Sequence, residues 1–175
     1  MHPWNRWTFI PASIAAISVS AYAKTYLSVE QAQQAIFPGA QFVAAPLALD
    51  AAQARAIEKK SGMEVRQREV KLWRVAGGGY FIVDEVLGKH EFITYAIGLN
   101  ADGSVRAIEI MDYRESYGHE IRDATWRGQF AGKTAASPVR LDRDIVNISG
   151  ATLSCKHIAD GVRRVLAFYE VALKR

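Results

Sequence analysis

The clearest amphipathic segment of the chain lies near its C-terminus and predicts a long helix. Its apolar residues recur on one helical face, at Ile158, Val162, Val165, Leu166, Tyr169 and Leu173. Three shorter helices are predicted over 28–37, 50–60 and 120–130. The first two begin with residues suited to cap a helix, which are Ser28 with Gln31 three positions later, and Asp50.

Extended segments fill the middle of the chain. Apolar runs and alternation predict strands over 70–76, 80–87, 92–99 and 104–111. The turn 100–103 ends in Asp102-Gly103, which favours a tight hairpin. Short strands are also expected over 139–141 and 145–148, and an irregular segment over 41–48. Consecutive hairpin strands flanked by helices predict an α+β fold. We expect a single domain with a mainly antiparallel sheet and a long C-terminal helix.

The first 23 residues indicate an export signal. Arg6 precedes an apolar stretch from Phe9 to about Val19, and Ala21-Tyr22-Ala23 matches a small-x-small cleavage site. We expect cleavage after Ala23, which leaves the domain 24–175 in the periplasm or another extracytoplasmic space. The apolar stretch is shorter than the roughly 20 residues of a transmembrane helix. The alternative is an uncleaved segment that anchors the protein to a membrane.

Composition and spacing narrow the classes of function. The net charge is +4, but the basic residues are dispersed and form no stripe with interleaved aromatic residues, so no nucleic-acid partner is expected. The single cysteine, Cys155, excludes an internal disulfide. It is either a redox thiol or a small buried hydrophobe. The histidines lack metal-ligand spacing and no serine lies in a G-x-S-x-G elbow, so neither a metal site nor a catalytic residue is expected.

The candidate chemistry lies where the C-terminal helix begins. Ser149-Gly150-Ala151-Thr152-Leu153-Ser154 follows an extended run over 144–148. Small residues at a helix start leave its first backbone N–H groups free, and these groups together with the helix dipole favour a phosphate. The Thr152 hydroxyl could bond to that phosphate or be esterified by it. The alternative is an ordinary helix cap, for which Ser, Gly and Thr are common residues.

This motif resembles the flavinylation motif of FMN-binding domains, which occur in the sodium-translocating NADH:quinone reductase and in the Rnf electron-transport complex. The resemblance implies that an exported flavin transferase joins FMN through a phosphoester to Thr152. Ser149, Gly150, Ala151, Leu153 and Ser154 would surround the attachment point. Many family members carry an acidic residue where this chain has Val146, and Asp144 and Asn147 are the nearby polar residues that could substitute for it.

Two further stretches extend the resemblance. Gly118-His119-Glu120 keeps part of an H-x-E-T-P-G-L-G-like stretch, and 126–133 is similar to a W-x-x-Q-F-x-G-K stretch of larger relatives. The resemblance implies flavin contacts from His119, Glu120 and Trp126. Each has an ordinary alternative, which is a solvated histidine, a carboxylate favoured at a helix start and a core aromatic residue. We expect the flavin to lie between the Thr152 helix start and the 113–126 segment.

The expected function is therefore electron transfer by an exported flavoprotein, rather than conversion of a substrate by an enzyme. A membrane-bound reductase or electron-transfer complex would be its redox partner. One rival is a sensory or adaptor module that binds FMN without a covalent bond. Another is an exported domain without flavin, in which the motif is only a helix cap.

Overall fold

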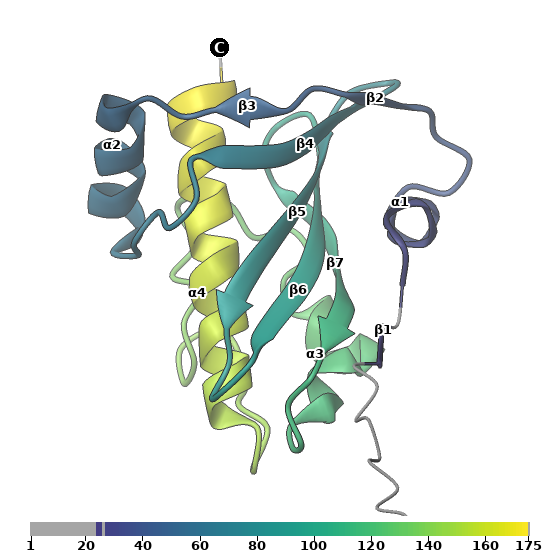
Figure 1. Ribbon diagram of the computed structural model, residues 1–175, viewed down its shortest axis with the longest axis vertical. Helices are drawn as coiled ribbons and strands as arrows, with labels where there is room; N and C mark the ends of the chain where they lie inside the picture. Colours follow the sequence, from purple (N-terminus) through teal and green to yellow (C-terminus); the bar gives the residue numbers. More distant parts are fainter. Residues whose placement is uncertain (1–23, 26, 175) are drawn as a thin grey trace, which may run out of the picture.

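The computed structural model describes residues 24–25 and 27–174 (Figure 1). A seven-stranded sheet, antiparallel at every pairing, has the order β1-β7-β6-β5-β4-β2, and β3 also pairs with β4. The predicted α+β fold is confirmed. The strands are β1 (Lys24–Thr25), β2 (Phe42–Ala44), β3 (Leu47–Ala48), β4 (Glu69–Val75), β5 (Tyr80–Leu87), β6 (Phe92–Leu99) and β7 (Val105–Tyr113).

Helices lie on both sides of this sheet (Figure 1). The long helix α4 (Thr152–Phe168) continues into a π-helical turn, η2 (Tyr169–Leu173), and packs on one face together with α2 (Ala51–Ser61). The short helix α1 (Val29–Ile36) covers the other face. Both α1 and α2 begin at the predicted caps, because Ser28 and Asp50 accept hydrogen bonds from the backbone of the first turn. Ser28 forms the predicted capping box with Gln31, and Asp50 forms one with Gln53 that was not predicted.

Alternation along the strands divides the core between the two faces. On β6, the side chains of Ile93, Tyr95 and Ile97 belong to the larger cluster under α4, whereas Ala96 belongs to the cluster under α1. The helix α4 approaches the sheet closely at Gly161, where an added Cβ would lie 2.6 Å from Val86 Cγ1 and 2.7 Å from the Tyr95 hydroxyl. This close packing fixes the position of α4, and with it the position of Thr152.

Three local expectations are wrong. The segment 120–130 is not one helix but a 3-10 turn, η1 (His119–Arg122), followed by α3 (Ala124–Gly128). The break falls at Asp123, whose backbone is extended (φ −61°, ψ 129°). The segment 41–48 is not irregular, because β2 and β3 form there by pairing with β4.

The expected strands over 139–141 and 145–148 are also absent from the described residues, which have a single bridge between Leu141 and Ile145 there. The chain instead closes into a loop. The carboxylate of Asp144 accepts hydrogen bonds from the N–H groups of Val139 (3.1 Å) and Arg140 (2.9 Å). Val139 and Asp142 have positive φ angles of 46° and 61°. A β-branched residue such as Val139 rarely adopts this conformation.

The predicted signal segment and its cleavage site after Ala23 lie outside the described residues. Within the described part of the chain, none of the helices combines the length and the apolar character that crossing a membrane requires.

Candidate functional site

Helix α4 begins without a side-chain cap. Its N-cap residue is Ala151, and no side chain accepts a hydrogen bond from the first turn. The backbone N–H groups of Thr152, Leu153 and Ser154 have no acceptor within the described part of the chain. The interpretation of the motif as an ordinary cap is therefore wrong, because neither Ser149 nor Thr152 caps the helix. The positive end of a 17-residue helix is left free for an anion.

The side chain of Thr152 is exposed at this helix end. Its Oγ1 accepts a hydrogen bond of 2.9 Å from Nδ2 of Asn147. The other amide atom, Asn147 Oδ1, is buried and has no hydrogen-bond partner among the described residues. Because buried acceptors are nearly always satisfied, this oxygen marks a place where a donor from outside the described chain would fit.

Asp144, the other polar residue considered as a substitute for the missing acidic residue, is turned toward its own loop. Besides Val139 and Arg140, it meets Lys133 Nζ at 2.9 Å. Burial alone would raise the pKa of Asp144, but the hydrogen bonds from Arg140, Lys133 and Val139 outweigh it and lower the pKa. Of the two candidates, only Asn147 contacts Thr152.

The segment after β7 is held against the first turn of α4. The Tyr113 hydroxyl donates to the carbonyl oxygen of Tyr117 and forms a 3.0 Å hydrogen bond with the Ser154 hydroxyl. Gly118, in the left-handed region at φ 90°, allows this approach, since an added Cβ would lie 2.6 Å from the Tyr113 hydroxyl and 3.2 Å from Cβ of Ala151. The two stretches that carry the family resemblance thus meet at the start of α4.

Two residues of the W-x-x-Q stretch hold the chain just before the motif. The Trp126 indole N–H donates to the carbonyl oxygen of Val146 at 2.8 Å, and the Val146 N–H donates to Gln129 Oε1 at 2.7 Å. Trp126 is only 5% exposed and packs edge-to-face on Phe130 with ring centroids 5.2 Å apart. Trp126 and Gln129 therefore fix the backbone that leads to Ser149, a role for Gln129 that the sequence did not reveal.

The family follows from a comparison with known families, since residues 88–167 match the model of the FMN-binding domain. The chain carries an FMN-binding domain. Its cofactor is FMN, as the sequence resemblance implies. The matched range runs from the β5–β6 turn into α4 and includes Thr152, Asn147 and Trp126. No curated protein matches the chain.

Apolar side chains lie exposed on the segments that meet at this end of the FMN-binding domain. Tyr117 is 83% exposed, Val146 is 69% exposed and Leu153 is 44% exposed. Each belongs to a segment tied to the start of α4 by the contacts above. A flat, largely apolar isoalloxazine ring would cover such side chains, and Tyr117 offers an aromatic face that the buried Trp126 lacks. The sequence motifs do not point to Tyr117.

The remaining predicted residues occupy different surroundings. His119 is exposed and Glu120 is half-buried, both in η1 next to Gly118. Ser154 is 5% exposed, with its hydroxyl on Tyr113. Cys155 is fully buried, and burial raises the pKa of its thiol. These surroundings favour the alternative of a small buried hydrophobe over that of a redox thiol.

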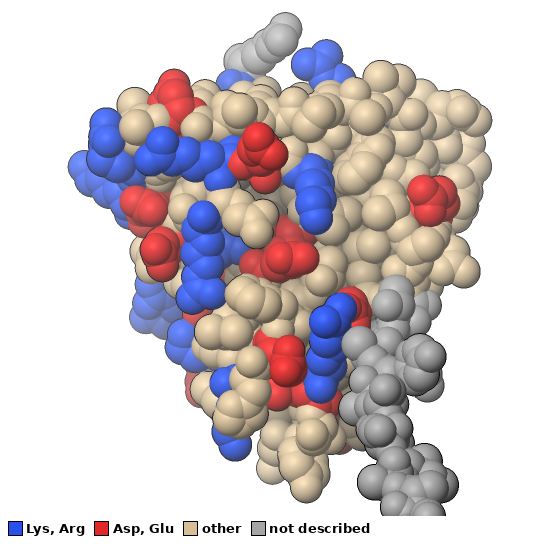
Figure 2. Space-filling model, in the orientation of Figure 1, with Lys and Arg blue, Asp and Glu red and all other residues tan. Residues whose placement is uncertain are grey.

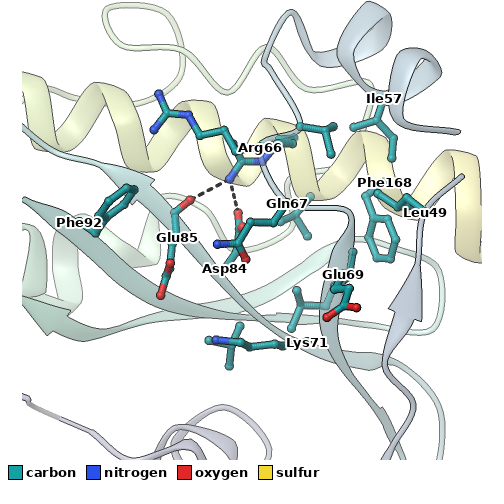
Figure 3. Close-up of a pocket in the computed structure, with 16 residues that line it drawn as sticks. Leu49, Ile57, Arg66, Gln67, Glu69, Lys71, Asp84, Glu85, Phe92 and Phe168 are labelled. Carbon is teal, nitrogen blue, oxygen red and sulfur yellow. Dashed lines mark hydrogen bonds and ion pairs between the residues drawn. The ribbon is translucent and has the colours of Figure 1, made fainter. Parts of the chain in front are cut away.

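A separate pocket of about 90 Å³ lies between α4, β5 and the 65–71 segment (Figure 3). At its base Arg164 donates to Asp84 Oδ2 at 2.7 Å and to the Glu85 carbonyl oxygen at 2.9 Å. None of the predicted site residues lines this pocket. Within the described residues, no group of three or more His, Cys, Asp or Glu side chains is arranged to hold a metal ion.

Proposed function

We propose that this FMN-binding domain is an exported electron carrier whose FMN is joined through its phosphate to the Thr152 hydroxyl. The observation that carries the proposal is the start of α4. There an exposed threonine hydroxyl stands on a helix end whose first three N–H groups have no acceptor in the described chain. Such an end stabilises a phosphate without any positively charged side chain.

The surrounding residues suit the same arrangement. The N–H groups of Thr152, Leu153 and Ser154 would hold the phosphate oxygens, and Asn147 would orient the Thr152 hydroxyl. The unsatisfied Asn147 Oδ1 could accept a hydrogen bond from a hydroxyl or N–H of the cofactor. Tyr117 and Leu153 would offer apolar contact to the ring.

Bound FMN supplies reversible electron transfer, and the protein binds it, orients it and sets its potential. Attachment through the phosphate consumes no atom of the ring. An acid, base or nucleophile acting on a substrate is not required for this function. The side chains around Thr152 would therefore serve to hold the cofactor at the surface, where a redox partner can approach it.

Export and partners are part of the proposal. The apolar stretch followed by Ala21-Tyr22-Ala23 supports cleavage after Ala23. The resemblance of the Thr152 motif adds an exported flavin transferase as the attaching enzyme and a membrane-bound reductase or electron-transfer complex as the redox partner. N-terminal sequencing of the exported protein should begin at Lys24. A mature protein that keeps Met1 and stays in the membrane fraction would instead establish an uncleaved anchor.

Covalent attachment is tested by mass. Protein produced together with a flavin transferase should gain the mass of FMN less one water, and its band on a denaturing gel should fluoresce. Thr152→Ala should abolish the gain, and Thr152→Ser should keep part of it because the hydroxyl remains. Ser149→Ala is the matched control, because Ser149 is an exposed hydroxyl in the same motif, and it should keep the adduct.

The result that contradicts the assignment is a full adduct on Thr152→Ala, which would move the attachment to Ser149 or Ser154. Flavin that is released on denaturation from the wild-type protein would support the non-covalent sensory or adaptor module. Reduction of the bound flavin by a strong electron donor, followed by reoxidation with a chemical acceptor, then tests the carrier function.

A further inference from the structure

A hollow of about 420 Å³ lies between the end of α2, the 135–143 loop and α4. It is called the basic hollow here, because none of the described residues that line it is acidic and five are cationic, namely Lys59, Lys60, Arg140, Arg143 and Arg163. In Figure 2, Lys and Arg side chains gather over α2, at the margin of the molecule. The pocket of Figure 3 differs, since its cationic side chains share the lining with Glu69, Asp84 and Glu85.

Arg163 gives the basic hollow a fixed frame. Its Nε donates to the Ser61 carbonyl oxygen at 2.8 Å, its Nη1 to the Val139 carbonyl oxygen at 3.0 Å, and its Nη2 to Asp160 Oδ1 at 2.8 Å. One guanidinium thus joins the end of α2, the 135–143 loop and α4. The hollow is therefore formed before any ligand binds.

The cations at its rim are available. The side chains of Lys59, Arg140 and Arg143 are exposed, and they make no hydrogen bond or ion pair with the described residues. Lys60 makes a long ion pair, with its Nζ 4.0 Å from Glu170 Oε2. The buried Asp160 does not offset the rim charges, because it is already paired with Arg163 and with Lys156 at 2.7 Å.

Helix electrostatics account for only part of this cluster. Lys59 and Lys60 lie in the last turn of α2, where cations stabilise the helix dipole. Arg140 and Arg143 have no such explanation. They are carried by the loop that the Asp144 carboxylate closes on itself, so a shaped backbone brings them to the hollow.

We propose that the basic hollow binds a small anion with two or more negative charges, of the phosphate or pyrophosphate class. One guanidinium group can donate two parallel hydrogen bonds to two phosphate oxygens. The volume of the basic hollow falls within the range of small-molecule sites. Arg163 lies 11 residues after Thr152 on α4, which is roughly 16 Å along the helix. The basic hollow is thus separate from the flavin attachment point, and this inference stands independently of the proposed function.

Isothermal titration of the flavin-loaded full-length protein with pyrophosphate tests the proposal. Saturable binding at one site is expected, and Arg140→Gln/Arg143→Gln should weaken it by about tenfold or more, because two charge-assisted contacts are lost. The control is Arg68→Gln/Lys71→Gln, which removes the same charge from two exposed residues outside the hollow. It should leave the affinity within about twofold. Circular dichroism melting checks the fold, and Lys59→Gln provides a second variant.

Lack of saturable pyrophosphate binding would overturn the proposal, as would equal weakening in the hollow and control variants. Vesicles with and without an anionic phospholipid form a second arm. Binding to the anionic vesicles without binding to pyrophosphate would overturn the small-anion site and assign the cations to a membrane surface.

Discussion

Replacing Asn147 by alanine should slow flavin attachment to Thr152. The change removes the Nδ2 donor that lies 2.9 Å from Thr152 Oγ1. A neutral hydrogen bond contributes about 0.5–1.5 kcal/mol, and about 1.4 kcal/mol corresponds to a tenfold change in rate. If the bond acts by orienting the hydroxyl for reaction, attachment should become about 2- to 13-fold slower. The fold should be little affected, because the unsatisfied Asn147 Oδ1 is removed as well.

The assay is a time course of adduct formation with a flavin transferase and its flavin donor, followed by intact mass. Asn147→Asp is the informative companion, since a carboxylate there would accept a hydrogen bond from the Thr152 hydroxyl. It should restore the rate or raise it above that of wild type. Asp144→Asn is the control, because the Asp144 carboxylate faces Val139, Arg140 and Lys133. It should leave the rate within about twofold.

Two results would refute this reasoning. A wild-type rate in Asn147→Ala would show that the contact with Thr152 has no role in attachment. A larger loss in Asp144→Asn than in Asn147→Ala, with both variants folded, would show that the 139–145 loop controls the site instead.

Four further predictions concern single residues. Tyr117→Ala should change the absorbance spectrum of the bound flavin, whereas Tyr117→Phe should preserve it. Trp126→Ala should lower the free energy of unfolding in urea by about 3–5 kcal/mol, and a folded variant with unchanged flavin spectrum and potential would remove Trp126 from the flavin site. Gly161→Ala should cost about 1–3 kcal/mol through the clash with Val86 and Tyr95; unchanged stability would show that α4 can shift. Burial, followed by the charge of Asp84, raises the pKa of Tyr95 well above its usual 10.0. The unfolding free energy should therefore fall as the pH rises above about 10, and Tyr95→Phe should flatten this fall.

Local interactions explain which elements the sequence predicts well. The helix caps at Ser28 and Asp50 and the turn at Gly103 are made by residues within three positions of one another, so the pattern alone identifies them. The pattern predicts short strands instead of the loop 139–145, because the shape of this loop depends on contacts made by Asp144. One of these contacts is the ion pair with Lys133. The short apolar run 145–148 does not indicate that this ion pair forms.

In the candidate site, too, the sequence predicts the local feature and misses the contacts between distant segments. The motif locates Thr152, because a run of small residues before an amphipathic helix is visible in the sequence. The contacts that hold the two ends of the motif in place are not visible in the sequence. Tyr113 contacts Ser154 across 41 positions, and Trp126 contacts the Val146 carbonyl oxygen across 20 positions. Large aromatic residues serve both cores and ligands, so only the burial of Trp126 and the exposure of Tyr117 separate their roles.

The pairing of β1 with β7 determines which end of the molecule is suited to tags and probes. Lys24 pairs with Tyr113, whose hydroxyl reaches Ser154, so a group fused ahead of Lys24 would join the strand next to the one that packs on the first turn of α4. The other end of the described chain follows α4 and η2 to Leu173, roughly 30 Å from Thr152 along the helix. Immobilisation through the C-terminus should therefore leave the Thr152 end facing solution. A dye on the C-terminus would lie at a distance suited to energy transfer with a flavin held at Thr152.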